Sequence, residues 1–439
     1  MKERKRIYLC LAHMSEAGLE QKYIKEAFDT NWVVPLGPNV NGFEADLEQF
    51  VGEDKKVVAL SAGTAAVHLA LLACGVGRGD EVVVQSFTFC ASSHPITYLG
   101  ATPIFVDSEK DSWNMDPELL ETAIKDRIAK TGKKPKAIVP VALYGMPYDV
   151  DRIMEIANRY DIPVVEDAAE GFGSRWKGRV LGTFGKYGVL SFNGNKMITT
   201  SGGGALVCPD LEAKNKIIWY ATQAREAYPY YQHEAIGYNY RMSNICAGIG
   251  RGQMTVVDDH IAHHKHVLEL YKELLKDVDG IEVHGNPDGR YDSNFWLNTI
   301  TIDPKLRIKG QENAYKTVVQ GAVGGAAGVV HATDSAHTDC EPNDNVEALR
   351  VVLDQAGIEA RPLWKPMHKQ PVYARVESSE LRVESLPGGM VCQTSDKSVA
   401  YVNGISEGLF KVGMCLPSGP YVSDEDVRYI VDCIKAAIV

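Results

Sequence analysis

Between Lys56 and Val207, short runs of β-branched residues alternate with longer stretches in which apolar residues recur every three or four positions. Runs of the first kind are typical of buried strands, and the longer stretches are typical of amphipathic helices. The strand-like runs are 57–60, 81–84, 103–106, 137–140, 162–165 and 189–192. The alternation predicts an α/β fold with a doubly wound, mostly parallel sheet, and ligands gather at the carboxyl ends of such strands.

A long helical pattern begins at Ser243 and continues to Leu275, and we interpret it as the connection into a second unit. The length of 439 residues exceeds what one hydrophobic core usually serves. We therefore expect a large domain with an N-terminal arm over residues 1–254 and a smaller C-terminal α/β domain over 255–439. Two loop-rich stretches of the second half, 304–345 and 376–403, look like insertions.

Composition narrows the class of partner. Hydrophobic residues make up 45% of the chain and charged residues 23%, as in ordinary globular proteins. A formal net charge of -11 argues against wide contact with nucleic acid. No apolar run approaches the roughly 20 residues of a membrane span. Nine cysteines without a CxxC pair indicate free thiols, so we expect a cytoplasmic protein whose partners are small molecules or other proteins.

The run Ser61–Ala66 follows a strand and opens a helix, so free backbone N–H groups and the positive end of the helix dipole face one point. Gly63 and Thr64 are therefore candidates for binding a phosphate. The alternative for this stretch alone is an ordinary strand-to-helix turn capped by threonine.

Asp167 ends a strand that is expected to be buried on both faces, where a carboxylate is costly unless it meets a cation or hydrogen-bond donors. A protonated ring nitrogen would supply such a partner, whereas a helix cap is the simpler alternative. Lys196 lies on a polar turn just after another strand, where a desolvated amine can condense with an aldehyde. A single loop lysine is otherwise most often a solvated charge.

Phe89 follows a third strand and could stack on a planar ring, with core packing as the alternative. Asp167, Lys196, Phe89 and the Gly63-Thr64 turn thus meet four separate needs of one cofactor: its ring nitrogen, its aldehyde, its ring face and its phosphate. Their joint occurrence at strand ends is far less probable by chance than any one of them.

Six motifs in order along the chain resemble those of the DegT/DnrJ/EryC1/StrS sugar aminotransferases, which have fold type I. The motifs are Gly42-Phe43-Glu44, Gly63-Thr64-Ala65-Ala66, Glu166-Asp167-Ala168-Ala169-Glu170, Ser191-Phe192-Asn193-Gly194-Asn195-Lys196, Gly237-Tyr238-Asn239-Tyr240-Arg241-Met242-Ser243 and Leu416-Pro417-Ser418-Gly419-Pro420. The resemblance covers almost the whole chain and implies a pyridoxal 5'-phosphate enzyme with a large, mostly parallel mixed-sheet domain and a smaller C-terminal α/β domain.

The resemblance also assigns roles to residues. It implies that Lys196 holds the cofactor as a Schiff base, that Asp167 pairs with the pyridine nitrogen, and that Phe89 stacks on the ring. Glu170 is implied to lie beside the ring. The same resemblance implies that Gly63, Thr64 and Ser191 hold the phosphate and that Asn239 reaches the phosphate of the neighbouring subunit. A homodimer with shared active sites is the expected assembly.

A narrower likeness points to the substrate. Glu170, where many members carry glutamine, together with 13–15, 31–38 and 361–368, resembles transaminases of the UDP-N-acetylbacillosamine type. This implies transfer of an amino group from L-glutamate to a UDP-linked 4-keto-6-deoxy-N-acetylhexosamine, with Lys196 moving the proton. Arg241 and His368 are candidates for binding the nucleotide, although an exposed arginine or a packed segment is an equal alternative.

Other functions remain as alternatives. Amination at carbon 3 of the sugar, a dehydratase of the same family and a non-catalytic binding protein are all compatible with the fold. The dehydratases resemble this chain but carry histidine at the position of Lys196. His331, Asp334, His337, Asp339 and Cys340 match no closed zinc spacing, so we expect no metal site. The run 321–328 lacks the strand, helix and acidic residue of a dinucleotide site.

Overall fold

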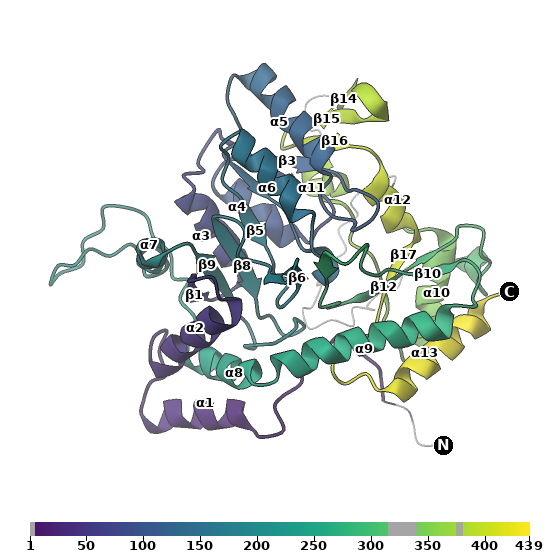
Figure 1. Ribbon diagram of the computed structural model, residues 1–439, viewed down its shortest axis with the longest axis horizontal. Helices are drawn as coiled ribbons and strands as arrows, with labels where there is room; N and C mark the ends of the chain where they lie inside the picture. Colours follow the sequence, from purple (N-terminus) through teal and green to yellow (C-terminus); the bar gives the residue numbers. More distant parts are fainter. Residues whose placement is uncertain (1–4, 315–339, 375–380) are drawn as a thin grey trace.

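The computed structural model describes residues 5–314, 340–374 and 381–439. Its centre is a sheet in which β3, β2 and β4 are parallel, and β5 is parallel to β8 (Figure 1). Parallel bridges between Ile138 and Val164 and between Val141 and Asp167 join β4 to β5. β9 runs antiparallel to both β8 and β1. The strands are β1 (Lys56–Leu60), β2 (Glu81–Gln85), β3 (Thr102–Val106), β4 (Ala137–Val139), β5 (Val165–Asp167), β8 (Tyr187–Ser191) and β9 (Gly204–Cys208).

The strands of this sheet are buried on both faces, which explains their nearly continuous apolar sequences. Val57 and Ala59 of β1 belong to a core shared with α2, α5 and α6, whereas Val58 and Leu60 belong to a core shared with α3, α4 and α7. The helices are α2 (Pro38–Val51), α3 (Gly63–Ala73), α4 (His94–Tyr98), α5 (Pro117–Thr131), α6 (Val150–Arg159) and α7 (Leu211–Ala221). The predicted mostly parallel α/β fold is confirmed, with β9 as its antiparallel member.

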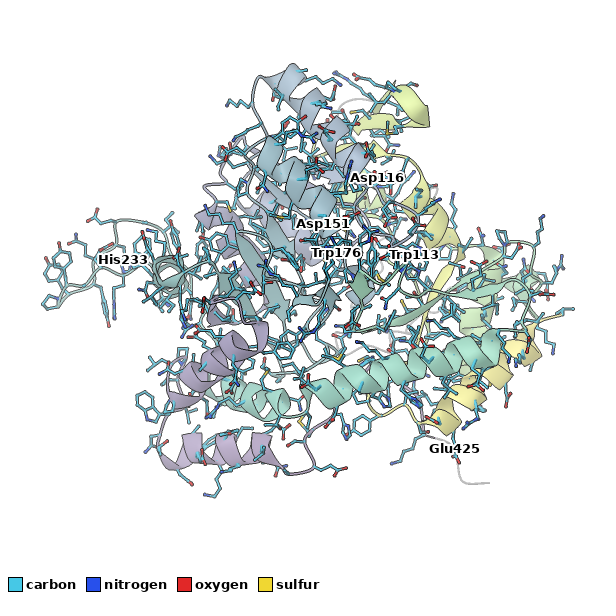
Figure 2. All side chains as sticks on the ribbon, viewed as in Figure 1. Trp113, Asp116, Asp151, Trp176, His233 and Glu425 are labelled. Carbon is cyan, nitrogen blue, oxygen red and sulfur yellow. The ribbon has the colours of Figure 1, made fainter. Side chains whose placement is uncertain are left out.

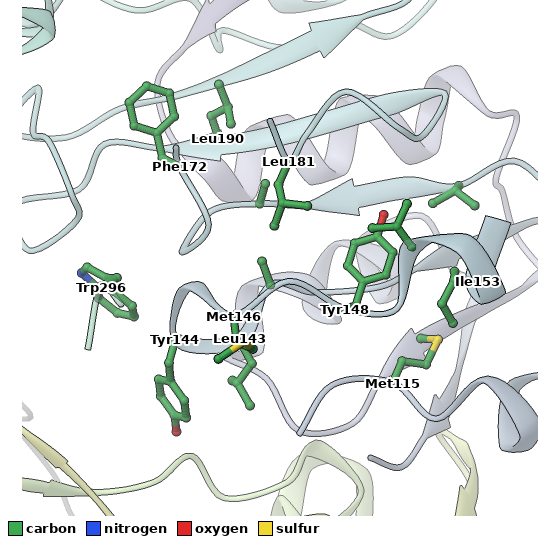
Figure 3. Close-up of a cluster of buried hydrophobic side chains, with 14 of the residues drawn as sticks. Met115, Leu143, Tyr144, Met146, Tyr148, Ile153, Phe172, Leu181, Leu190 and Trp296 are labelled. Atoms are coloured by element: carbon green, nitrogen blue, oxygen red, sulfur yellow. The ribbon is translucent and has the colours of Figure 1, made fainter. Parts of the chain in front are cut away.

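Local sequence fixes the helices that cover the sheet. Asp149 caps α6 by accepting a hydrogen bond from the backbone N–H of Arg152 at 3.1 Å. Val150, Ile153 and Ile156 recur at helical spacing and are buried. Figure 3 shows Ile153 beside Tyr148 in this part of the core. The amphipathic pattern of the sequence therefore determines the face that α6 turns to the sheet.

The C-terminal half forms a second, antiparallel sheet with the order β10, β12, β17, β13. Ile300, Ile302, Met414 and Leu416 from this sheet pack in one core with the helices α9, α10 and α13. These elements are β10 (Ile281–Val283), β12 (Asn298–Ile302), β13 (Arg361–Pro362), β17 (Gly413–Leu416), α9 (Val257–Leu275), α10 (Asp344–Gln355), α12 (Ile405–Val412) and α13 (Asp424–Ala437). We propose that the chain passes from the large to the small unit at the break between α8 (Asn244–Met254) and α9.

The second of the two expected insertions differs from its loop-rich prediction. It contains β14 (Arg382–Ser385), β15 (Val391–Thr394) and β16 (Val399–Val402), and β16 pairs in parallel with β3 at the edge of the large sheet. The reason is that Val399–Val402 is an apolar run that is buried throughout, and β3 offers it an open edge. Residues 381–403 thus extend the sheet of the large unit.

Most of the first expected insertion lies outside the described residues, including the glycine-rich run 321–328 and His331, Asp334, His337 and Asp339. Within the parts that are described, Cys340 is buried and α10 begins at Asp344. No group of three or more histidine, cysteine, aspartate or glutamate side chains suited to a metal occurs in residues 5–314, 340–374 and 381–439. Among the same residues, no helix is both long enough and apolar enough to cross a membrane.

The remaining elements lie around these two sheets. A small three-stranded sheet has the order β11, β6, β7, and α1 packs on α8. Their bounds are α1 (Leu19–Asp29), α11 (Pro371–Ala374), β6 (Arg175–Trp176), β7 (Arg179–Val180) and β11 (Tyr291–Asp292). After α7 the chain projects away from the body of the molecule, and Figure 2 shows His233 on this projecting segment, residues 222–240.

The fold makes a prediction about pH. His264 of α9 is fully buried, and burial lowers its pKa to about 3. The histidine therefore takes up a proton near pH 6.5 in the unfolded chain but only near pH 3 in the folded chain. Its contribution to the stability of the fold is complete above pH 6.5 and is lost as the pH falls towards 3. This one group should lower the free energy of unfolding by about 2 kcal/mol between pH 7 and pH 5.

His264→Phe should reduce that loss, measured by urea unfolding at both pH values. His233→Phe, on the projecting segment, is the matched control for replacing a histidine and should keep the wild-type pH dependence. Equal pH dependence in His264→Phe and the wild type would contradict the assignment.

Candidate active site

A cavity of about 370 Å³ lies where the carboxyl ends of the central strands meet. Asp167 is the last residue of β5, Ser191 is the last of β8, and Gly63 is the first of α3. The structure thus gathers most of the residues predicted from the sequence around one space. Those that line it are Gly63, Thr64, Phe89, Asp167, Glu170, Ser191 and Lys196.

One end of the cavity is built by the N-terminus of α3. Ala62 precedes the helix in an extended conformation, and no side chain of the described residues caps the helix there. A Cβ on Gly63 would lie 3.0 Å from Cβ of Ser191, and a Cβ on Gly204 would lie 2.3 Å from the backbone N of Gly63. Close packing of β8 and β9 against this turn leaves its first N–H groups and the nearby hydroxyls of Thr64 and Ser191 for an anion. This arrangement fits a phosphate.

Asp167 lies elsewhere in the cavity wall and is only 3% exposed. Its carboxylate accepts hydrogen bonds from Oγ of Ser92 at 2.6 Å and from the backbone N–H of Ala169 at 3.1 Å. Burial raises the pKa of the Asp167 carboxyl, and the Ser92 hydrogen bond opposes the rise. Each carboxylate oxygen has a second lone pair, so a cationic ring nitrogen placed here would relieve the cost of burying the charge.

Lys196 lies between a carboxylate and an aromatic ring. Its Nζ is 3.5 Å from Oε1 of Glu170 and 3.9 Å from the centroid of the Trp296 ring. The backbone N–H of Tyr144 donates to Oε2 of Glu170 at 2.7 Å. Burial raises the pKa of the Glu170 carboxyl, the nearby charge of Lys196 opposes this, and Asp167 adds to it. The carboxyl of Glu170 and the ring of Trp296 are therefore both in contact with the Lys196 amine.

The mouth of the cavity is aromatic. Phe89 is 50% exposed, and its ring centroid lies 5.5 Å from that of Trp364. The backbone N–H of Trp364 donates to the hydroxyl of Tyr144 at 2.7 Å, which fixes the segment after β13 against the large unit. A planar ring held between the phosphate end and Asp167 would meet the exposed side chain of Phe89.

Three predicted residues do not line this cavity. Arg241 donates through Nη1 to Oε1 of Glu44 at 2.6 Å and to the carbonyl of Ala59 at 3.0 Å, so it joins α2 to β1. His368 is buried, with its Nδ1 2.6 Å from Oγ of Ser86, and burial lowers its pKa to about 4. Both side chains make contacts within the fold, and their binding of a nucleotide stays a prediction. Asn239 is exposed on the projecting segment.

The sequence reasoning missed Ser92, Tyr144 and Trp296. Ser92 follows Phe89 by three residues and could have been noticed as a hydroxyl near a strand end. Tyr144 has a positive φ of 54°, uncommon for a residue with a side chain, which turns its N–H to Glu170. Trp296 lies just before β12 of the antiparallel sheet, whereas the sequence rule considers only residues at the carboxyl ends of strands.

The buried carboxylate suggests a test with two readouts. Asp167→Asn should raise the free energy of unfolding of the cofactor-free protein by about 1 kcal/mol, because it removes a charge from a buried position. The same change should lower turnover at least about 100-fold, because an amide cannot pair with a ring cation. Chemical unfolding and steady-state rates measure the two effects.

Asp107→Asn is the matched control for this change. Asp107 is equally buried, but it accepts hydrogen bonds from the backbone N–H groups of Ser108, Asn403, Gly404 and Ser406. Its replacement should lower stability, since an amide nitrogen cannot accept those bonds. A stability loss in both variants would show that Asp167 is a structural carboxylate.

Known proteins that resemble this chain are aminotransferases, as the residues of the cavity suggest. A model of the DegT/DnrJ/EryC1/StrS aminotransferase family matches residues 15–324. EpsN of Bacillus subtilis, which is provisionally named a pyridoxal phosphate-dependent aminotransferase, is 40% identical over 98% of this chain and 95% of its own length. GDP-perosamine synthase of Escherichia coli O157:H7 is 32% identical over 98% of both chains.

A solved structure gives the same answer for the fold. The crystal structure of a DegT DnrJ EryC1 StrS aminotransferase from Brucella abortus superposes with a TM-score of 0.77, at 26% identity over 96% of this chain and 95% of that one. The chain therefore belongs to the DegT/DnrJ/EryC1/StrS aminotransferase family and is a pyridoxal phosphate-dependent aminotransferase of nucleotide sugars.

Proposed function

We propose that this enzyme transfers the amino group of L-glutamate to carbon 4 of a UDP-linked 4-keto-6-deoxy-N-acetylhexosamine. The observation that carries the transfer is the single cavity in which Lys196, Asp167 and the phosphate-binding turn at Gly63 meet. Glu170, in contact with Lys196, supports the choice of carbon 4 through the likeness described from the sequence.

The residues that would hold the cofactor divide by chemistry. The turn at Gly63 and Thr64, with the hydroxyl of Ser191, would bind its phosphate, and Asp167 would pair with its ring nitrogen. Phe89 would cover one ring face. When bound, pyridoxal phosphate supplies an aldehyde that accepts an amine and a ring that withdraws electrons from the neighbouring carbon.

Lys196 supplies the proton movement. Its Nζ lies in the cavity next to Glu170. It can therefore take a proton from the donor carbon that carries the nitrogen and deliver it to the cofactor carbon that would be bonded to the same nitrogen. The same atom then acts in the reverse order on the keto sugar. Glu170 keeps the amine near the reacting atoms, because the pair is buried and little water competes for either group.

The sugar nucleotide would enter at the aromatic mouth. Phe89 and Trp364 offer flat apolar surfaces on which a hexose ring or a base can pack. The relative from Escherichia coli is named for a GDP-linked product, and a comparison of UDP- and GDP-linked sugars distinguishes the two nucleotides.

We propose a homodimer in which Asn239 of one subunit approaches the phosphate site of the other. Asn239 does not line the cavity of its own chain, and the projecting segment around it carries exposed apolar side chains. These are Tyr228, Tyr230, Tyr231 and Ile236. A segment of this kind is costly to leave in water, and an isologous interface would cover two copies at once. The nine free cysteines support a reducing compartment, the cytoplasm.

Replacing Lys196 tests the transfer. The purified enzyme should be yellow, and its absorbance should change when glutamate is added. Lys196→Ala should lower the rate of that change at least about 1,000-fold, since both the attachment point and the base are removed. Lys186→Ala is the control, because Lys186 is exposed just before β8 and should leave the rate unchanged. Normal turnover by Lys196→Ala would contradict the proposal.

A panel of keto sugar nucleotides tests the substrate. UDP- and GDP-linked 4-keto-6-deoxy sugars, with and without the N-acetyl group, and a UDP-linked 3-keto sugar would each be incubated with enzyme and glutamate. We expect the highest kcat/KM for the UDP-linked N-acetyl 4-keto sugar, with the new amine at carbon 4 by NMR. Amination at carbon 3, or preference for GDP, would overturn this assignment and leave the amino transfer intact.

A further inference from the structure

We propose that Trp296 is a positioning residue for Lys196, and that the buried side chain of Asn294 holds both Trp296 and Glu170 against the lysine amine. The inference deepens the proposed function, because it rests on Lys196 being the residue that moves the proton. It concerns a part of the chain that no cofactor-binding motif includes, the turn that leads into β12.

Trp296 is fixed to the turn that carries Lys196. The indole is 2% exposed, and its Nε1–H donates to the carbonyl of Asn195 at 2.6 Å. Its ring face then lies 3.9 Å from Nζ of Lys196, within the range of a cation–π contact. Oγ of Ser418 donates to the carbonyl of Trp296 at 2.9 Å, so the backbone is held as well as the ring.

Asn294 connects the two groups that touch the lysine. Its Oδ1 accepts from the backbone N–H of Trp296 at 2.8 Å, and its Nδ2 donates at 2.9 Å to the carbonyls of Glu170 and Phe172. The side chain is fully buried, so each bond is expensive to leave unmade. One amide therefore sets the separation between the Glu170 segment and the Trp296 segment.

The backbone between these residues is strained in a way that a functional placement would explain. Phe295 has a φ of 50°, a left-handed conformation that a residue with a side chain seldom adopts. Its N–H is held by Oγ of Ser293 at 2.9 Å. The surrounding bonds thus maintain a conformation that costs free energy and that places Trp296 in the wall of the cavity.

Trp296 and Glu170 both favour the protonated form of the Lys196 amine. The face of an indole attracts a cation more strongly than a neutral amine, and the Glu170 carboxylate attracts the same cation. Asp167 is a second carboxyl that interacts electrostatically with this amine, and the nearby thiol of Cys10 stays neutral because burial raises its pKa to about 12. Lys196 that has taken up a proton is therefore held near the carbon to which the proton must go, and is shielded from water.

The test uses the cofactor-free protein, in which no amino transfer is needed. Lysines would be labelled competitively with a trace of acetic anhydride, and peptide mass analysis would give the rate at Lys196 relative to the exposed Lys186. In Trp296→Leu the Lys196 rate should rise between about twofold and about thirtyfold, because the neutral amine is freed and uncovered. Trp296→Phe should stay within about twofold of the wild type.

The Phe and Leu variants both lose the hydrogen bond to Asn195, so their difference isolates the aromatic face. Trp296→Tyr and Trp296→Met form a second pair if the leucine variant does not fold. In the holoenzyme, the rate of the absorbance change with glutamate should fall in the leucine or methionine variant relative to its aromatic partner, and the aromatic variant should rescue it.

Equal labelling of Lys196 in the aromatic and the aliphatic variant would overturn the proposal and leave Trp296 as a packing residue. That result is distinct from failure of the amino transfer, which the Lys196→Ala experiment measures with the cofactor bound.

Discussion

Asp167 ends a strand that is covered on both faces, and its carboxylate lies out of reach of bulk water. A charge in this position raises the free energy of the folded chain unless a cation approaches it, and Ser92 and Ala169 supply only two hydrogen bonds. The other groups of the active site are arranged around this buried charge. Lys196 and Glu170 stand in the same cavity, and the phosphate-binding turn faces it, so a cofactor with a cationic ring nitrogen and an anionic phosphate completes the electrostatics that the fold leaves open.

The C-terminal half contributes more than a cover to this site. Trp296 comes from the turn before β12 and Trp364 from the segment after β13, and both line the cavity. Tyr144 of the large unit donates through its N–H to Glu170 and accepts through its hydroxyl from Trp364. A shift of the antiparallel sheet relative to the central sheet would therefore move Trp296, which contacts Lys196, together with Trp364 at the mouth of the cavity. Residues from the central sheet and from the antiparallel sheet build one site.

The sequence predicted the parts of the site that follow from strand ends. Asp167, Lys196 and Phe89 could be found because apolar runs mark buried strands, and residues at the end of such a run lie at the ligand edge. Ser191 was assigned through the family resemblance alone. Arg241 could not be interpreted in the same way, because its partner Glu44 is 197 residues away and nothing local reveals the ion pair. Trp296 was not predicted for a related reason, because its role depends on contacts with Asn195 and Lys196, about 100 residues earlier in the chain. The strand at Val399–Val402 was hidden because its partner is β3.

That last pairing has a consequence for how the protein is made. β3 is complete when residue 106 has left the ribosome, but the strand that covers its outer edge ends at residue 402. During nearly 300 residues of synthesis, the nascent large unit presents an open row of backbone donors and acceptors to any other strand in reach. The C-terminal segment thus acts as the closing piece of the N-terminal unit, and the chain must be almost fully translated before its central sheet is protected from intermolecular pairing.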